Sequence, residues 1–313
     1  MKRDYDAPVL IDMPVPAVDS RAGLVARGVA WLERHALICG LFAIGYLVAV
    51  TLLHDLMQQP AYWAQGQLSH RSWNRLVTLV SAPILVVFCI GVVWSLRRHP
   101  HPGTVVVYVA ITVLLAIASF RTLLVMNIEV IHFPQYAILV CLLFPLRFRY
   151  GETVVWATLG ALIDEGYQYF YLYADRRIHF DFNDIILNTI GAGFGVVLLL
   201  TALPARPPGH RMSGSAHFAR FVVSPACVAT WAALLGCGVL YGLGRLRLLP
   251  LPAGSDAWAI VLRRGGPSSA FWTHTDWGKT YHDVQPLEWL LITAVLVGIY
   301  FALDVISPVK PRR

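Results

Sequence analysis

The sequence predicts an all-α protein, a polytopic bundle of about eight transmembrane helices with both termini in the cytoplasm. Only 14% of the residues are charged and 57% are hydrophobic, whereas soluble domains carry about a quarter charged residues. The mean hydropathy is +0.60. Apolar runs of about 17 to 25 residues, the length that crosses a bilayer as a helix, recur along the chain.

The apolar runs place the spans in order. Residues 1–35 lack the basic flank and short apolar run of a signal peptide, so they are expected to form a cytoplasmic segment. The expected spans are residues 36–53, 76–95, 104–120, 128–146, 153–173, 184–203, 221–244 and 288–304. The fourth and fifth spans are the unusual ones, because they contain ionisable residues.

The distribution of basic residues predicts the orientation. With the N-terminus inside, the cytoplasmic segments carry 15 Lys and Arg residues and the outer segments carry 10, as the positive-inside rule requires. A polar stretch rich in Pro, Gly and Ser, 204–220, is expected to be a cytoplasmic linker. It would separate a six-span unit, 36–203, from a two-span unit, 221–313, with a long exterior loop at 245–287.

Other classes of protein are disfavoured. The basic residues are scattered through the loops, so bilayer orientation explains the net charge of +7 better than a nucleic-acid partner does. No recognised metal-ligand spacing is present, and neither a metal nor a cofactor is expected. The five cysteines all lie in apolar runs and are expected to be buried free thiols: Cys39, Cys89, Cys141, Cys227 and Cys237.

The fifth and sixth spans carry polar residues at one depth. Asp164 and Glu165 lie ~17 Å along a helix that enters at residue 153, and Gln168 lies ~22 Å along it, in the outer half of a ~30 Å core. On the sixth span, Asp184 and Asn188 share one helical face. Gly191 and Gly195 continue that face as a small-xxx-small pair and are expected to allow close helix packing.

The fourth span and one outer loop complete this arrangement. Glu129, His132 and Tyr136 repeat at three and four residues and lie at the same end of the bundle. The loop that follows the fifth span adds four polar residues above them: Arg176, Arg177, His179 and Asp181.

Two interpretations of these residues remain open. Carboxylates facing lipid near a helix centre cost ~2.5 to 3.5 kcal/mol each, so the stripes are expected to face one another and to approach Arg176 or Arg177. The result would be either a set of structural ion pairs or an outward-facing pocket. The pocket would be formed by Glu129, His132, Tyr136, Gln168, Arg176, Arg177, Asp181, Asp184 and Asn188.

The motifs "EVIHFPQYAIL" and "DEGYQYF", followed by an Arg, Asp, Asn and Gly pattern, resemble the VanZ-like family of bacterial membrane proteins over residues 128–203. The resemblance implies a protein of the bacterial cytoplasmic membrane and cell envelope. The family's namesake is associated with resistance to teicoplanin, a glycopeptide antibiotic. The matching positions are His132, Phe133, Tyr136, Asp164, Glu165, Gln168, Arg177, Asp184, Asn188, Gly191 and Gly195.

Three functions are compatible with this pattern. The first is binding of a lipid-linked or cell-wall-related ligand in the outward pocket, with the lipid bilayer as the other expected partner. The second is an embedded enzyme acting on a polyprenyl phosphate or glycolipid, in which Asp164 or Glu165, with His132, supplies acid and base chemistry. The third is a proton-coupled transporter that uses Asp164, Glu165 and His132 as a relay.

Overall fold

The computed structural model describes residues 31, 34–97, 99, 101–147, 149–174, 179–203, 214–249, 258–264 and 271–306. The elements are α2 (Ala36–Leu52), α3 (His54–Gln67), α4 (His70–Leu96), α5 (Pro102–Thr122), η1 (Asn127–Ile131), α6 (His132–Leu143), η2 (Phe144–Leu146), α7 (Tyr150–Tyr167), η3 (Gln168–Leu172), α8 (Phe182–Ala202), α9 (Gly214–Val222), α10 (Pro225–Gly242), β1 (Leu246–Arg247), β2 (Ile260–Val261), β3 (Trp272–His274), β4 (Thr280–His282) and α11 (Pro286–Ile306). The expected all-α polytopic fold is confirmed.

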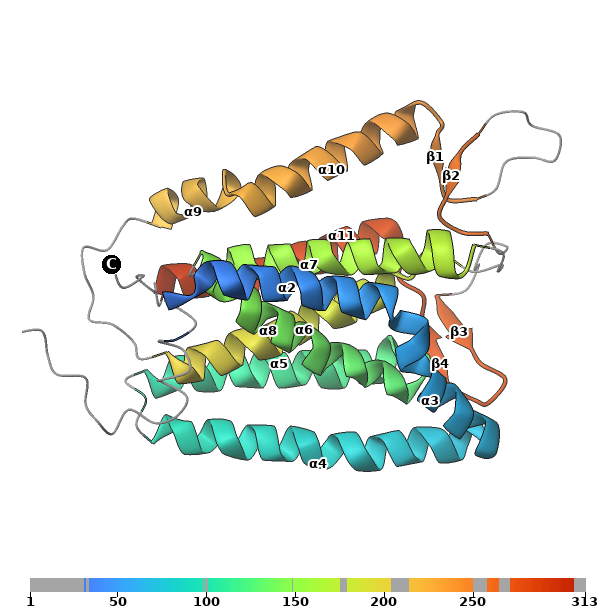
Figure 1. Ribbon diagram of the computed structural model, residues 1–313, viewed down its shortest axis with the longest axis horizontal. Coiled ribbons are helices and arrows are strands. Elements are labelled where there is room, and N and C mark those ends of the chain that lie inside the picture. Colours follow the sequence, from blue (N-terminus) through green and yellow to red (C-terminus); the bar gives the residue numbers. More distant parts are fainter. Residues whose placement is uncertain are drawn as a thin grey trace, which may run out of the picture.

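The long helices lie side by side as a bundle around α8 (Figure 1). Of the apolar stretch of α8, 83% is buried, against 11% for α4 and 6% for α10, which form opposite outer sides of the bundle. α7 ends, α8 begins and all four strands lie at one end of the bundle, which we call the loop end (Figure 1). α11 ends at the other end, where α2 begins.

The expected number of spans exceeds the number of helices that meet simple criteria for a span. Within the described residues, six helices are long and apolar enough to cross a membrane, and the bent pair of α2 and α3 would make a seventh. α7, expected as the fifth span, is not among them, because Glu152, Asp164 and Glu165 interrupt its apolar character. It nevertheless packs inside the bundle, with most of its residues buried.

Several elements differ from the sequence-based expectation. The stretch between the first two expected spans forms α3, a polar helix bent by 66° from α2. The expected linker 204–220 contains the start of α9, and Val223 and Ser224 separate α9 from α10. Short strands form inside the expected exterior loop: β1 pairs in parallel with β2, and β3 pairs antiparallel with β4.

α6 and α8 approach each other closely through glycines. A Cβ atom added at Gly191 would lie 2.6 Å from the carbonyl oxygen of His132, and one at Gly195 would lie 2.6 Å from the carbonyl oxygen of Ala137. Only glycine fits where two backbones come this close. The contact therefore fixes the rotation of α6 against α8, and with it the direction of the polar side chains on both helices.

α11 packs into the same bundle. The Tyr108 hydroxyl donates to the carbonyl oxygen of Ile299 at 2.9 Å, and the Thr112 and Tyr300 hydroxyls lie 3.0 Å apart. At the end opposite the loop end, Asp304 accepts the first backbone N–H groups of α7 at 2.7 and 2.9 Å. A carboxylate stabilises a helix N-terminus in this position, so α11 anchors the helix that carries Asp164.

Replacing Gly195 by alanine tests the α6–α8 contact. The added Cβ would also lie 2.8 Å from the Val140 Cβ, and such overpacking typically costs about 1 to 3 kcal/mol. We expect a lower unfolding temperature and a lower yield of monodisperse protein in detergent. Gly298→Ala is the matched control, because a Cβ at Gly298 meets no atom within 4 Å. Equal stability of the two variants would contradict the proposed packing.

Candidate functional site

The loop end contains a carboxylate that organises the backbone. Glu165, near the end of α7, accepts the backbone N–H of Asp181 at 2.9 Å. Asp181 is the N-cap of α8, and its own carboxylate accepts the N–H groups of Asn183 at 2.9 Å and Asp184 at 3.4 Å. N-cap carboxylates satisfy donors that a helix start leaves open. Glu165 and Asp181 therefore join the end of α7 to the start of α8.

His132 and Asp184 form an ion pair between α6 and α8. Nε2 of His132 lies 3.4 Å from Oδ1 of Asp184, and the side chains are only 8% and 18% exposed. Nδ1 of His132 is buried and has no hydrogen-bond partner. The close α6–α8 contact brings His132 and Asp184 together, as expected if the polar faces of these two helices meet.

Three further buried side chains near this pair have a polar atom without a partner: Tyr136 (Oη), Asp164 (Oδ1) and Asn188 (Oδ1). Their residues are at most 2% exposed. Tyr136 is close enough to interact electrostatically with both Asp164 and Asp184. We call His132, Tyr136, Asp164, Asp184 and Asn188 the inner cluster.

The surroundings of Asp164 complete the inner cluster. Its Oδ2 accepts the Gln168 side-chain amide at 3.3 Å. Thr51 of α2 and His54 of α3 are its polar neighbours on the other side, although neither the Thr51 hydroxyl nor Oδ1 of Asp164 reaches good hydrogen-bond geometry. The sequence did not identify Thr51, which lies in an apolar span, or His54, because α3 was not expected.

Three of the predicted pocket residues that the structure describes are not members of the inner cluster: Glu129, Gln168, which borders it through Asp164, and Asp181, which caps α8. The Glu129 carboxylate turns back to accept the N–H groups of Val125 at 2.9 Å and Met126 at 2.8 Å, and so caps η1. Arg176 and Arg177 lie outside the described residues.

Two arginines that the structure places at the loop end, Arg263 and Arg264, come from the segment after β2. Arg264 donates to the carbonyl oxygens of Tyr169, Tyr173 and Ala174 at 2.9 to 3.0 Å, and its guanidinium lies 4.0 Å from the Tyr169 ring centroid. It thus satisfies the last carbonyls of the helix that carries Asp164, where a cation is favoured. Adjacent Arg263 pairs with Asp283. The sequence pattern identified neither residue.

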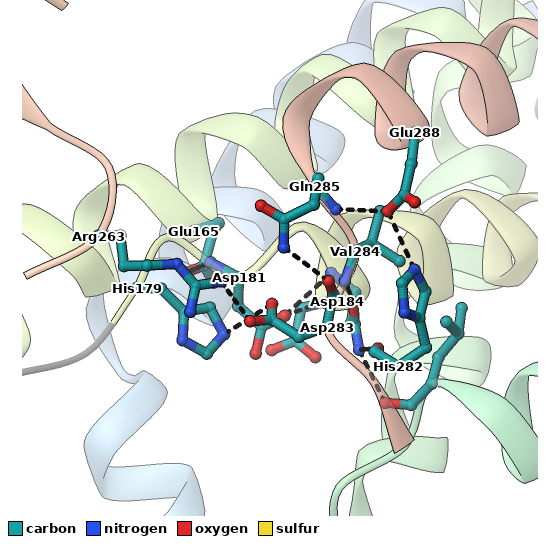
Figure 2. A network of polar contacts seen from close by, with 12 residues as sticks. Glu165, His179, Asp181, Asp184, Arg263, His282, Asp283, Val284, Gln285 and Glu288 are labelled. Atoms are coloured by element: carbon teal, nitrogen blue, oxygen red, sulfur yellow. Dashed lines mark hydrogen bonds and ion pairs between the residues drawn. The ribbon is translucent and has the colours of Figure 1, made fainter. Parts of the chain in front are cut away.

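An outer polar network attaches the chain before α11 to the start of α8 (Figure 2). The Asn183 amide donates to the carbonyl oxygens of Leu123 at 2.9 Å and His282 at 2.7 Å, and its oxygen accepts the N–H of Val284 at 2.9 Å. The amide oxygen and the amide nitrogen of Asn183 are thus both hydrogen-bonded, which indicates a structural role.

Asp283 and Glu288 extend the outer network. Asp283 pairs with Arg263, and its other oxygen lies 3.3 Å from Nε2 of His179. Glu288 accepts from the backbone of Gln285 at 2.8 Å and lies 2.9 Å from Nε2 of His282 (Figure 2). These side chains have protein partners, whereas the inner cluster keeps four buried polar atoms without one.

A cavity of about 150 Å³ lies beside the outer network. Phe180 and Phe182 line it from the entry to α8, Leu262 and Arg263 line it from the segment after β2, and Pro286 lines it from the start of α11. None of the inner-cluster residues lines it. Within the described part of the chain, no group of three or more His, Cys, Asp or Glu residues is arranged to hold a metal ion.

The acidic residues around the start of α8 perturb one another. Burial, together with the facing carboxylates of Asp184 and Asp283, raises the pKa of Asp181 to about 8. Burial also lowers the pKa of His179, despite the nearby carboxylate of Asp283. The loop end therefore favours uncharged forms of both side chains.

The raised pKa of Asp181 predicts a pH-dependent stability. A carboxyl group with a higher pKa in the folded than in the unfolded state stabilises the fold below its unfolded pKa, and that contribution disappears as pH rises toward about 8. We expect the unfolding temperature in detergent to fall between about pH 4 and pH 8. Asp181→Asn keeps a good N-cap and should flatten this decline, whereas Asp276→Asn, in an exposed turn, should not. Parallel curves for all three proteins would refute the assignment.

Comparison with known proteins identifies the family of the chain. A family model, VanZ/LLP1, matches residues 41–203, just over half of the 313-residue chain, and the match includes the whole inner cluster. No curated protein and no solved structure matches the chain. The resemblance seen over 128–203 is confirmed and extends back into α2. The chain is a membrane protein of the VanZ/LLP1 family.

Proposed function

We propose that the inner cluster binds a lipid-linked or cell-wall-related ligand at the outer face of the bacterial cytoplasmic membrane. Through this ligand the protein would lower susceptibility to teicoplanin-type glycopeptides. The observation that carries the proposal is the set of four buried, unpartnered polar atoms on His132, Tyr136, Asp164 and Asn188. They belong to α6, α7 and α8, and the family match includes all of them.

The cost of burying these polar atoms without partners favours a bound group that supplies hydrogen bonds to them. A buried polar atom without a partner costs about 1 to 3 kcal/mol, and more than nine in ten such atoms in native proteins have a partner. Inside a bilayer, bulk water does not supply one. Four atoms of this kind on three packed helices are therefore better explained by a ligand, or by water that a ligand displaces, than by structural ion pairs.

The orientation of the bundle supports an outward site. The loop end lies opposite the basic segments that the positive-inside rule assigns to the cytoplasm. Cell-wall precursors and glycopeptide antibiotics meet on the outer side of the membrane. A pocket at the loop end would therefore face the compartment in which such a ligand is found.

One observation favours an embedded enzyme as the second candidate. His132 is paired with Asp184 through Nε2 and keeps Nδ1 open, and Asp164 keeps one oxygen open. A histidine held by a carboxylate and facing a second carboxylate is a common acid–base arrangement. Glu165 supports this role less well, because its carboxylate already binds the Asp181 backbone.

The packing below the inner cluster weighs against a transporter. Further along α8, Gly195 lies against the backbone of Ala137 and the side chain of Val140. Val140, Val196 and Val197 are fully buried. A substrate pathway through the bundle would have to open this apolar contact, whereas a binding site at the loop end leaves it closed.

Tyr136→Phe separates binding from folding. The variant removes an unpartnered buried hydroxyl, so we expect the ligand-free protein to unfold at an equal or higher temperature, with a gain of about 0 to 2 kcal/mol. Lipids co-purified with the wild-type protein, identified by mass spectrometry, should be depleted from the variant. A destabilised variant that retains the same lipids would show that the hydroxyl is structural.

Asp164→Asn distinguishes the two candidate functions. In a teicoplanin-susceptible bacterium, the wild-type gene should raise the minimum inhibitory concentration, and the variant should lose this effect because the open carboxylate is gone. Gln59→Glu, at an exposed position of α3, serves as the control for expression. If purified wild-type protein converts extracted envelope lipids, and the variant binds them without turnover, the enzyme is favoured. No change in either assay would refute both roles for Asp164.

A further inference from the structure

The unpartnered atoms of the inner cluster are mostly hydrogen-bond acceptors. Asp164 and Asn188 each offer an oxygen, and the Tyr136 hydroxyl can accept as well as donate. His132 uses one ring nitrogen on Asp184 and leaves Nδ1 open. A ligand that satisfies this set must bring donors.

The charge of the inner cluster also indicates the kind of ligand group that fits it. His132 compensates Asp184, but no Lys or Arg within the described ranges forms an ion pair with Asp164. Three basic side chains of the loop end are engaged elsewhere: Arg263 with Asp283, Arg264 with three carbonyl oxygens, and Lys279 with the Phe120 carbonyl at 3.1 Å. The basic neighbours of Asp164 include His54 of α3 and the already paired His132. A buried carboxylate that forms no ion pair with Lys or Arg is costly, and a cation would compensate it.

We infer that the group entering the inner cluster is a primary ammonium. It carries one positive charge and three N–H donors, which match the charge of Asp164 and the acceptor oxygens of Asp164, Asn188 and Tyr136. A phosphate would instead bring acceptors and negative charge to a site that already has both. This inference rests on the proposed ligand site and specifies the chemistry of the ligand.

An ammonium at this depth can come from two sources. One is the headgroup of an aminophospholipid whose chains remain in the outer leaflet. The other is a free amine from the exterior. Both have the same recognised group, so a test must vary the headgroup and also supply the amine without chains.

The test compares three phospholipids with the same acyl chains. The full-length protein is reconstituted in an equimolar mixture of phosphatidylethanolamine, phosphatidylcholine and phosphatidylglycerol, then extracted, and its retained lipid is measured by native mass spectrometry. Phosphatidylethanolamine has the charge and the N–H donors, phosphatidylcholine has the charge without the donors, and phosphatidylglycerol has no cation. We expect at least tenfold enrichment of phosphatidylethanolamine over each of the others.

Variants connect the preference to the inner cluster. Asp164→Asn removes the charge at nearly constant shape, and Asn188→Leu removes an acceptor; each should reduce the enrichment to less than threefold. Thr189→Val is the matched control, because its hydroxyl is already engaged: it donates to the Ile185 carbonyl at 2.8 Å and lies 3.1 Å from the Thr158 hydroxyl. It should keep the wild-type enrichment. Unfolding temperatures measured on the same samples identify any variant that has lost its fold.

A competition arm identifies the source. If free ethanolamine at millimolar concentration displaces the lipid and raises the unfolding temperature of delipidated protein, the ammonium alone is sufficient; if it does neither, the lipid headgroup is the source. Equal retention of all three lipids, lost in Asp164→Asn, would overturn the ammonium inference and leave the ligand site intact. Absence of retained lipid together with no response to ethanolamine would overturn both.

Discussion

The rest of the structure depends on the close approach of α6 and α8. Where the Gly191 and Gly195 backbones contact α6, two helices from separate spans become one rigid unit. Their polar residues lie on the faces that meet, so rotation of either helix would expose His132 or Asp184 to lipid. Because each ionised group is costly in hydrocarbon, packing and electrostatics select the same arrangement. α7 then adds Asp164 to an alignment that is already fixed.

The loop end contains two polar networks. The groups of one are hydrogen-bonded, and the other contains buried polar atoms without partners. In the outer network, Asn183, Asp283 and Glu288 have partners on neighbouring segments. In the inner cluster, open oxygens and nitrogens are buried together. A protein that needed only cohesion would gain stability by filling those positions with apolar side chains. The unsatisfied atoms are therefore a cost consistent with binding, whereas the satisfied ones account for the shape of the site.

Much of this arrangement could be predicted from local patterns. The spacing of His132 and Tyr136, and of Asp184 and Asn188, predicted which helical face is polar. Hydropathy predicted most of the helices. Glu129 fits the same spacing, but two nearby N–H groups engage its carboxylate as a cap of η1. α3 is too polar for a hydropathy search, and Arg264 reaches its acceptors from about 90 residues away in the chain. No periodicity within one segment encodes such contacts.

The contacts of Arg264 and Asn183 show that the segment matched by the family and the segment that folds as a unit differ in length. The family resemblance covers residues 41–203, yet η3, which continues α7, and the first turn of α8 are held by residues from 261 onward. Within this chain, the unit recognisable by descent is shorter than the unit that folds. A relative that ends near residue 203 must complete the same helix ends by other means, so sites in the family can share their interior residues while differing in the part that encloses them.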